Sequence, residues 1–280
     1  MCLLVVAWQA HPQYRVVVAA NRDEFHARPT APLARWAEPP RILAGRDLQA
    51  GGTWIGLDAA RRFGLVTNYR ERAPPRPAAP SRGRLVPAFL GAPQSAVHYL
   101  QALEADAPTY AGFNLLLGDG ERLMYASNRA ARFARELEPG LHGLSNHLLD
   151  TPWPKLQRVR IEVETWIERA STGRGAPTNK GARASPDLAA DAEWLMTVFA
   201  DRRRTPAPHD PDSGLTSDWE QVLSAPFVLN PEYGTRCTTV LLIDHDGRTW
   251  IGERRFDAQG RSVGQNEWPL NAGDWPGASA

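Results

Sequence analysis

The sequence has little cysteine, no long hydrophobic run and no excess of charge of either sign. It holds two cysteines in 280 residues, Cys2 and Cys237, so a framework of disulfides is not expected. The net charge of +1 gives no electrostatic reason to expect nucleic acid as a partner. No run of about 18 apolar residues occurs, and the apolar run at the N-terminus stops at Trp8, too early for a signal peptide. We therefore expect a cytoplasmic protein without a membrane span, whose partner is a small molecule.

Several common catalytic motifs are missing as well. There is no Gly-rich phosphate loop, no His-Glu-x-x-His and no Cys-x-x-Cys. The run from Asp244 to Gly247, "DHDG", lacks the remaining ligands of a calcium loop, and a hairpin turn explains it. We therefore expect no metal site.

Apolar runs separated by turn residues predict an α+β fold, with helices packed on antiparallel sheets. Hairpins are expected from strands at 2–9 and 14–25, 51–58 and 61–70, 110–120 and 121–128, and 236–256. Helices are expected after Ser81, and at 95–106, 153–170 and 186–202. The Pro-rich stretch from Asn21 to Gly52 is predicted to be a long loop. We expect a single domain spanning residues 1–280, with flexible loops near 70–84, 171–186 and 205–216.

Cys2 follows the initiator methionine directly and begins the first predicted strand. If Met1 is removed, the chain starts with a cysteine whose α-amine has a pKa of about 7.7–8.0 and can accept the thiol proton. The alternative is that Cys2 is a small core residue, which is a common role of cysteine. Position alone leaves both interpretations open.

The run "NRDE", from Asn21 to Glu24, ends the second predicted strand with four polar side chains. Asp23 can hold an ammonium, Arg22 can hold a thiolate or carboxylate, and Asn21 can donate to an oxyanion. The alternative is a solvated turn with an internal ion pair of little energy.

Three other polar residues end or begin strands in the same way: Asn68, Asn146 and Arg236. One asparagine at a strand end is usually a turn residue. Together with "NRDE" they indicate that several strands deliver side chains to one edge, where Trp54 is expected to line a pocket.

Eight segments carry a resemblance to a known family. They are "MCLLVVAW", "AANRDEF", "GGTWIGL", "GLVTNYR", "SRGRL", "GFNLLLGD", "GLSNHLLDTPWPK" and "YGTRCTTVLLID". In this order they resemble the NRDE-motif family, also called the transport and Golgi organisation protein two family. The resemblance extends from Met1 to about Phe256. It implies the four-layer αββα sandwich of N-terminal nucleophile hydrolases.

The same resemblance implies roles for individual residues, by comparison with cysteine-type members of that superfamily such as conjugated bile salt hydrolases and penicillin V acylases. Their nucleophile corresponds to Cys2, the acid that grips its α-amine to Asp23, and the oxyanion donor to Asn68. A second asparagine corresponds to Asn146 and a late arginine to Arg236. Those enzymes carry an arginine three residues before the aspartate, whereas Arg22 adjoins Asp23, which leaves its role open.

The sequence and the resemblance therefore leave two alternative functions. The first is a hydrolase that needs no cofactor and acts on a linear amide or an acyl thioester through an acyl-Cys2 intermediate, with Asn21, Arg22, Glu24 and Trp54 contacting substrate. The second, implied by the family's association with haem trafficking and with acyl-coenzyme A and lipid metabolism, is a non-catalytic carrier that binds haem or an acyl-coenzyme A in the same pocket. The sequence contains no Cys-x-x-Cys-His attachment motif, but Cys2 can serve as a thiolate ligand of haem iron.

Overall fold

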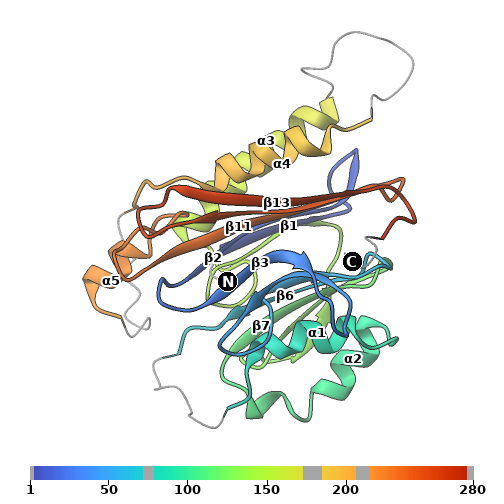
Figure 1. Cartoon of the computed structure of the whole chain (residues 1–280), viewed down its shortest axis with the longest axis horizontal. Coiled ribbons are helices and arrows are strands. Elements are labelled where there is room, and N and C mark those ends of the chain that lie inside the picture. Colours follow the sequence, from blue (N-terminus) through green and yellow to red (C-terminus); the bar gives the residue numbers. More distant parts are fainter. Residues whose placement is uncertain (1–2, 72–78, 173–184, 206–214, 276–280) are drawn as a thin grey trace.

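Two antiparallel sheets lie face to face between two layers of helices (Figure 1). The computed structural model describes residues 3–71, 79–172, 185–205 and 215–275. This arrangement confirms the predicted α+β class and the four layers of an αββα sandwich. The predicted flexible segments fall largely outside the described residues.

The first sheet has six strands in the order β10-β1-β2-β11-β12-β13. These strands are β1 (Leu3–Trp8), β2 (Tyr14–Phe25), β10 (Gly140–Leu144), β11 (Tyr233–Asp244), β12 (Thr249–Phe256) and β13 (Ser262–Leu270). β1 and β2 are apolar along most of their length because both faces are covered, one by the second sheet and the other by helices. The continuous apolar runs that predicted these strands reflect this double burial.

The second sheet has seven strands in the order β3-β4-β5-β6-β7-β8-β9. They are β3 (Thr30–Arg35), β4 (Leu43–Asp47), β5 (Ile55–Leu57), β6 (Phe63–Asn68), β7 (Phe113–Gly118), β8 (Leu123–Ser127) and β9 (Ala134–Glu136). The strand predicted at 14–25 is confirmed as β2, but the prediction of a long loop from Asn21 to Gly52 is wrong, since β2 includes residues 21–25 and β3 and β4 follow it. Pro32 lies within β3, at the edge of the sheet, where a strand can lack one amide donor.

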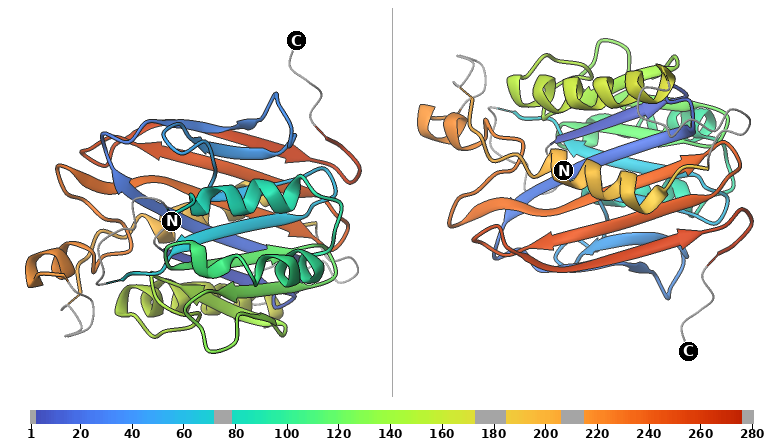
Figure 2. Two further views of the ribbon diagram at one scale, coloured as in Figure 1. Left: turned by 90° about the horizontal axis from the view of Figure 1, so that it is seen from below. Right: turned by 90° about the horizontal axis from the view of Figure 1, so that it is seen from above.

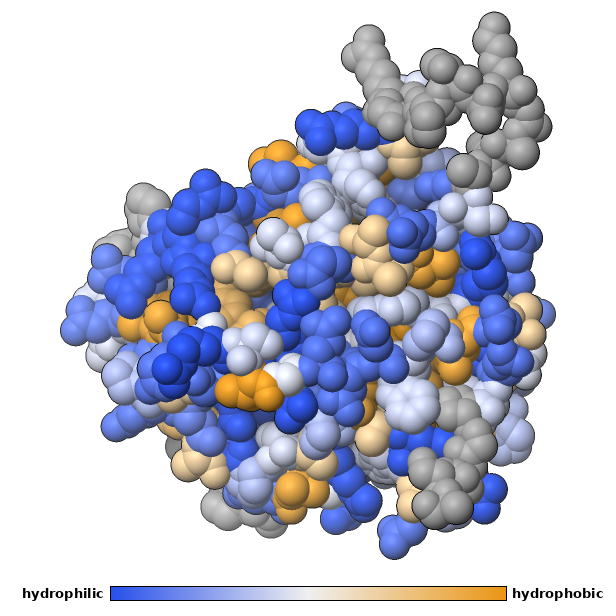
Figure 3. Space-filling view, turned by 45° about the horizontal axis from the view of Figure 1, so that its top comes forward, coloured by the Kyte–Doolittle hydropathy of each residue, from blue (hydrophilic) through white to orange (hydrophobic). Residues whose placement is uncertain are grey.

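Helices cover the two outer faces, as the views from below and above show (Figure 2). α3 (Pro154–Thr172) and α4 (Leu188–Phe199) pack on the first sheet, while α1 (Leu85–Leu90) and α2 (Ala96–Leu103) pack on the second. Short helical turns are η1 (Arg82–Arg84), η2 (Ala107–Thr109) and α5 (Ser217–Val222). The surface in Figure 3 is mainly polar, with its hydrophobic residues in small separate patches. Among the described helices, none is long and apolar enough to cross a membrane.

Asn21 shows how the first sheet is tied to its helical layer. Its side chain is fully buried, and Nδ2 donates to the carbonyl oxygens of Phe199, at the end of α4, and Pro226, each at 2.9 Å. Oδ1 accepts from Thr238 Oγ1 at 2.6 Å. All three bonds lie on the helix side of β2, so the predicted contact with substrate is replaced by a structural role.

We expect Asn21→Ala to lower the free energy of unfolding by about 2–4 kcal/mol, because it leaves two carbonyls and one hydroxyl buried without their donor or acceptor. Chemical denaturation of the purified variant measures this loss. Asn271→Ala, at an exposed position, is the control and should change stability by less than about 0.5 kcal/mol. A similarly small effect of Asn21→Ala would contradict the assigned role.

Candidate functional site

The site is built around the end of β2, where the "NRDE" residues still belong to the strand. Leu3 is the first described residue of β1 and pairs with Asn21. Because side chains alternate along a strand, Arg22 and Glu24 point to the face opposite to Asn21 and Asp23. Cys2 lies outside the described residues, so its predicted contacts are not placed by the structure.

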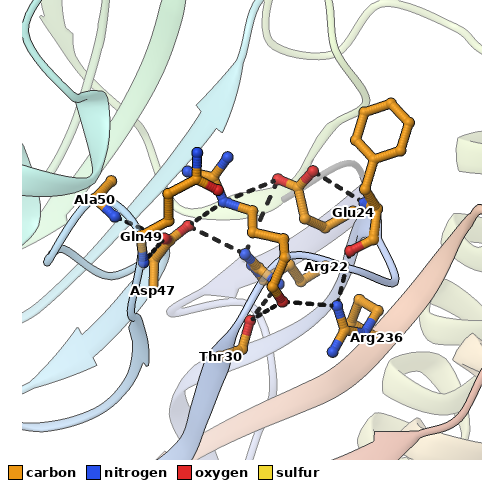
Figure 4. A network of polar contacts seen from close by, with 9 residues as sticks. Arg22, Glu24, Thr30, Asp47, Gln49, Ala50 and Arg236 are labelled. Carbon is orange, nitrogen blue, oxygen red and sulfur yellow. Dashed lines mark hydrogen bonds and ion pairs between the residues drawn. The ribbon is translucent and has the colours of Figure 1, made fainter.

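Arg22 is held between the two sheets at this edge (Figure 4). Its side chain is 4% exposed, and the guanidinium carbon lies 4.5 Å from the ring centre of Trp54, which is equally buried. The guanidinium donates to Thr30 Oγ1 and Asp47 Oδ2, both at 3.3 Å. A buried cation needs such partners, so Arg22 is fixed in place by residues of the second sheet.

Asp47 forms ion pairs with both Arg22 and Arg28. Its carboxylate accepts from Arg28 Nε at 2.6 Å and from the backbone amides of Gln49 and Ala50 at 3.0 Å (Figure 4). Burial alone would raise the pKa of the Asp47 carboxyl, but these hydrogen bonds and the charges of Arg28 and Arg22 outweigh it and lower the pKa. Asp47 is therefore an anion that stabilises the native site.

Arg236 reaches the same edge from β11. The pairing of β11 with β2 shifts between Thr235 and Cys237, so Arg236 lies at a β-bulge. Its NH1 group donates to the carbonyl oxygens of Phe25 at 2.8 Å and Arg28 at 3.1 Å. Burial and the nearby charge of Arg22 lower the pKa of the Arg236 guanidinium. The bulge thus adds a second arginine beside Arg22.

Asp23 faces the helix side of β2 and is 3% exposed. Its Oδ1 accepts from Thr235 Oγ1 at 2.7 Å, and the same hydroxyl accepts from the backbone amide of Val228 at 2.9 Å. These hydrogen bonds fix the carboxylate in place. It lies close to the beginning of β1, because Leu3 pairs with Asn21, two positions before Asp23.

Asn68 and Asn146 meet although they come from different sheets. Asn68 ends β6, while Asn146 follows β10 and has a φ of 58°, a conformation that asparagine tolerates well. Asn146 Nδ2 donates to the carbonyl oxygen of Asn68 at 3.3 Å, and the Asn146 carbonyl accepts from the amide of Arg70 at 2.8 Å. The predicted meeting of these two asparagines is thus present. The side chain of Asn68 is exposed to solvent.

A buried polar network behind Asn146 was not predicted from the sequence. Asn114, fully buried in β7, donates through Nδ2 to Thr67 Oγ1 at 3.1 Å and to the carbonyl oxygen of His147 at 2.9 Å. Its Oδ1 accepts from Tyr125 OH at 2.8 Å. The signal was an asparagine within the apolar run "GFNLLLG", where a polar side chain needs buried partners. The network supports the backbone that carries Asn146.

Two adjoining cavities open at this edge. The first has a volume of about 310 Å³ and a polar lining that includes Arg22, Glu24, Asp47, Trp54 and Asn68. The second has a volume of about 380 Å³ and is lined mainly by apolar and aromatic side chains, with Asn146 at its wall. They share Asn68, Arg82 and Ala111. Cavities of this size can take a small organic ligand.

The family model described as Transport and Golgi organisation 2 matches residues 1–258. The chain belongs to this family. A homologue from Bos taurus, named Transport and Golgi organization protein 2 homolog, is 34% identical over 269 residues, covering 91% of this chain and 92% of its own. The Homo sapiens homologue is 31% identical over 273 residues, with the same coverage of 91% and 92%. Among solved structures, a Caenorhabditis elegans ortholog of N-acylethanolamine-hydrolyzing acid amidase aligns over 86% of this chain and 92% of its own, with 10% identity and a TM-score of 0.46.

In this member of the Transport and Golgi organisation 2 family, Cys237 lies in the core directly beside Arg22 in the β-sheet pairing. Burial raises the pKa of the Cys237 thiol well above its usual value, and the neighbouring Glu253 adds to the effect. Glu253 is itself 1% exposed, accepts from the amide of Leu33 at 3.0 Å, and has a pKa raised by burial. Cys237 is therefore a buried core thiol whose neutral form is favoured.

No cluster of three or more histidine, cysteine, aspartate or glutamate side chains is arranged to hold a metal ion within the described ranges. The groups that remain available at the edge are amides, guanidinium groups and carboxylates. The amide and guanidinium donors are suited to binding anionic parts of an organic molecule and to stabilising an oxyanion, whereas the carboxylates are suited to cationic or hydrogen-bond-donating parts.

We expect Asp47→Asn to destabilise the protein at pH 7, with a difference from wild type that shrinks as the pH falls below about 4. The pKa of this carboxyl is lower in the folded than in the unfolded protein, so its stabilisation is complete above the unfolded value and is lost as pH falls through the folded value. Urea denaturation at pH 7 and pH 3 measures both differences. Asp246→Asn, at an exposed position, should stay within about 0.5 kcal/mol of wild type. An equal effect of Asp47→Asn at both pH values would contradict the charged role.

Proposed function

We propose that this protein is an N-terminal cysteine hydrolase that acts on a linear amide or an acyl thioester through an acyl-Cys2 intermediate. The observation that carries the proposal is the meeting of Asn68 and Asn146 between a polar and an apolar cavity. Leu3 pairs with Asn21, and the next residue of β2, Arg22, lines the polar cavity. This supports a nucleophile at the residue before Leu3.

The reaction would proceed in two balanced steps. Cys2 Sγ gives its proton to the α-amine of the mature chain and attacks the acyl carbonyl carbon. The bond from this carbon to nitrogen or sulfur then breaks, and the leaving group takes the proton from the α-ammonium. In the second step, water attacks the acyl-cysteine, releases the carboxylic acid and restores the thiol.

The remaining residues would position these groups. Asp23, fixed by Thr235, would hold the α-ammonium, and the Asn68 amide with a backbone N–H would stabilise the oxyanion. The Asn146 side chain bonds to the Asn68 carbonyl and so orients Asn68. The apolar cavity suits an acyl group and the polar cavity suits the leaving group, since each matches the polarity of its occupant.

The alternative is a carrier that binds haem or an acyl-coenzyme A without reaction. Arg22, Arg28 and Arg82 line the polar cavity and can pair with carboxylates or phosphates. The described residues that line the two cavities include no histidine or methionine, so an iron ligand would have to come from Cys2. The two functions use the same cavities and differ in whether a covalent acyl group forms.

We expect the mature protein to lack Met1 and to gain the mass of one octanoyl group when it is incubated with an octanoyl thioester. Intact-mass and peptide mass spectrometry should place this group on Cys2. Cys237→Ala is the matched control and should acylate normally, since that thiol is buried with a raised pKa, whereas Cys2→Ala should not acylate. Retained Met1, or tight ligand binding with no adduct, would contradict the hydrolase and favour the carrier.

We expect Asn68→Ala to slow acylation by about 10²–10³-fold, the usual cost of losing one oxyanion donor. The fold should persist, because the bond from Asn146 goes to the Asn68 backbone carbonyl, which the substitution keeps. Stopped-flow acylation gives the rate, and iodoacetamide labelling of Cys2 tests whether the thiol itself is unchanged. Asn271→Ala is the matched control. An unaltered acylation rate in Asn68→Ala would remove this residue from the reaction.

A further inference from the structure

The apolar cavity is lined by aromatic and aliphatic side chains and by more basic than acidic side chains. Its apolar lining consists of Phe25, Tyr69, Leu215, Trp219, Leu223 and Tyr233, with Ala111. Three charged residues also line it: Arg70, Glu71 and Arg82. The balance of these charges decides what kind of ligand the cavity prefers.

Glu71 is already neutralised by a partner outside the cavity. Its Oε1 accepts from Arg129 Nε at 2.8 Å, and its Oε2 accepts from the backbone amide of Gly112 at 2.8 Å. Arg82 donates to the carbonyl oxygen of Gly112 at 2.8 Å and adds its charge near Glu71. Glu71 is therefore paired with Arg129, and no ion pair joins it to Arg70 in the described part of the chain.

Arg70 is held in position by its backbone while its side chain stays available. Its amide donates to the carbonyl oxygen of Asn146 at 2.8 Å. The guanidinium carbon lies 6.0 Å from the ring centre of Trp153. Its guanidinium makes no hydrogen bond or ion pair with another side chain or carbonyl of the described residues. An arginine that lines an apolar cavity and has no ion-pair partner among the described residues is poised for an anion from outside.

A small neighbouring cavity points to the same conclusion. It has a volume of about 30 Å³ and shares Arg70 and Leu223 with the apolar cavity. Two cations, Arg70 and Lys155, and one acid, Glu220, line it. No ion pair joins Arg70 to Glu220 in this part of the described structure. Arg70 therefore faces both cavities without an ion pair to a described acid.

We propose that the apolar cavity binds an apolar group that carries a carboxylate, and that Arg70 pairs with this carboxylate. The planar guanidinium matches a carboxylate through two parallel hydrogen bonds. A carboxylate, with one negative charge, is preferred over a phosphate dianion, because the apolar walls offer too few hydrogen-bond donors to compensate a second charge. The inference rests on the acyl-transfer site proposed above, whose substrate would then have an acyl group with a second, distal carboxylate.

The test is a binding measurement in the Cys2→Ala background, where no acyl transfer occurs. Isothermal titration compares decanoate with decanamide, its neutral counterpart, at pH 7.5 and low salt. We expect decanoate to bind about 10–100-fold more tightly, the range that a charge-assisted hydrogen bond supports. Arg70→Gln should abolish this preference, Arg70→Lys should keep part of it, and Arg122→Gln, which changes an exposed arginine on the β7–β8 turn, should leave it unchanged.

Equal affinities for the two ligands, binding of neither, or a preference that persists in Arg70→Gln would each overturn the inference. Tighter binding of decyl phosphate than of decanoate would overturn the choice of a carboxylate. If Arg70→Gln does not fold, as circular dichroism would show, the ligand comparison in the Cys2→Ala parent and in Arg70→Lys still decides. A carboxylate preference without acylation of Cys2 in the wild-type chain would remove the hydrolase function and keep this site.

Discussion

The burial of the Arg22 guanidinium sets the arrangement of the whole site. A charge that is 4% exposed is costly unless it is paired and hydrogen-bonded. Arg22 finds these partners in Thr30 on β3, Asp47 on β4 and the ring of Trp54, which directly precedes β5. β3, β4 and β5 belong to the second sheet, while Arg22 itself belongs to the first. One side chain therefore fixes the distance between the two sheets where the polar cavity opens. Gly45 makes room for this, because a Cβ there would lie 2.3 Å from the Trp54 ring.

The sequence predicted those parts of the fold and site that depend on local pattern. Continuous apolar runs predicted β1, β2 and β11, and strand ends predicted that Asn68, Asn146, Arg22 and Arg236 would gather at one edge. The edge strand β13 is not predicted by this pattern, since it has mostly exposed or half-exposed polar residues and a proline and so lacks the apolar run.

The partners of the predicted residues were missed for a different reason. Asp47 is 25 positions from Arg22, and Asn114 is 33 positions from His147, so no spacing rule connects them. Asn21 was read as a donor to substrate because of its neighbours in "NRDE". Its alternation within a longer strand turns it instead toward Phe199 and Thr238. Sequence pattern locates the edge, whereas long-range hydrogen bonds decide which side chains face it.

The distribution of charge also bears on which of the two cysteine thiols can ionise. Glu253 lies under the edge close to Cys237, and burial raises the pKa of both groups, so neither readily becomes an anion. The charge of Arg22 is therefore met by Asp47, whose pKa is lowered, rather than by the buried glutamate or thiol. An electropositive, partly open environment favours a thiolate, and a dry one with a nearby acid opposes it. The core thus keeps Cys237 as a neutral thiol, and the cationic end of β2 is the place where a reactive thiolate can be stabilised.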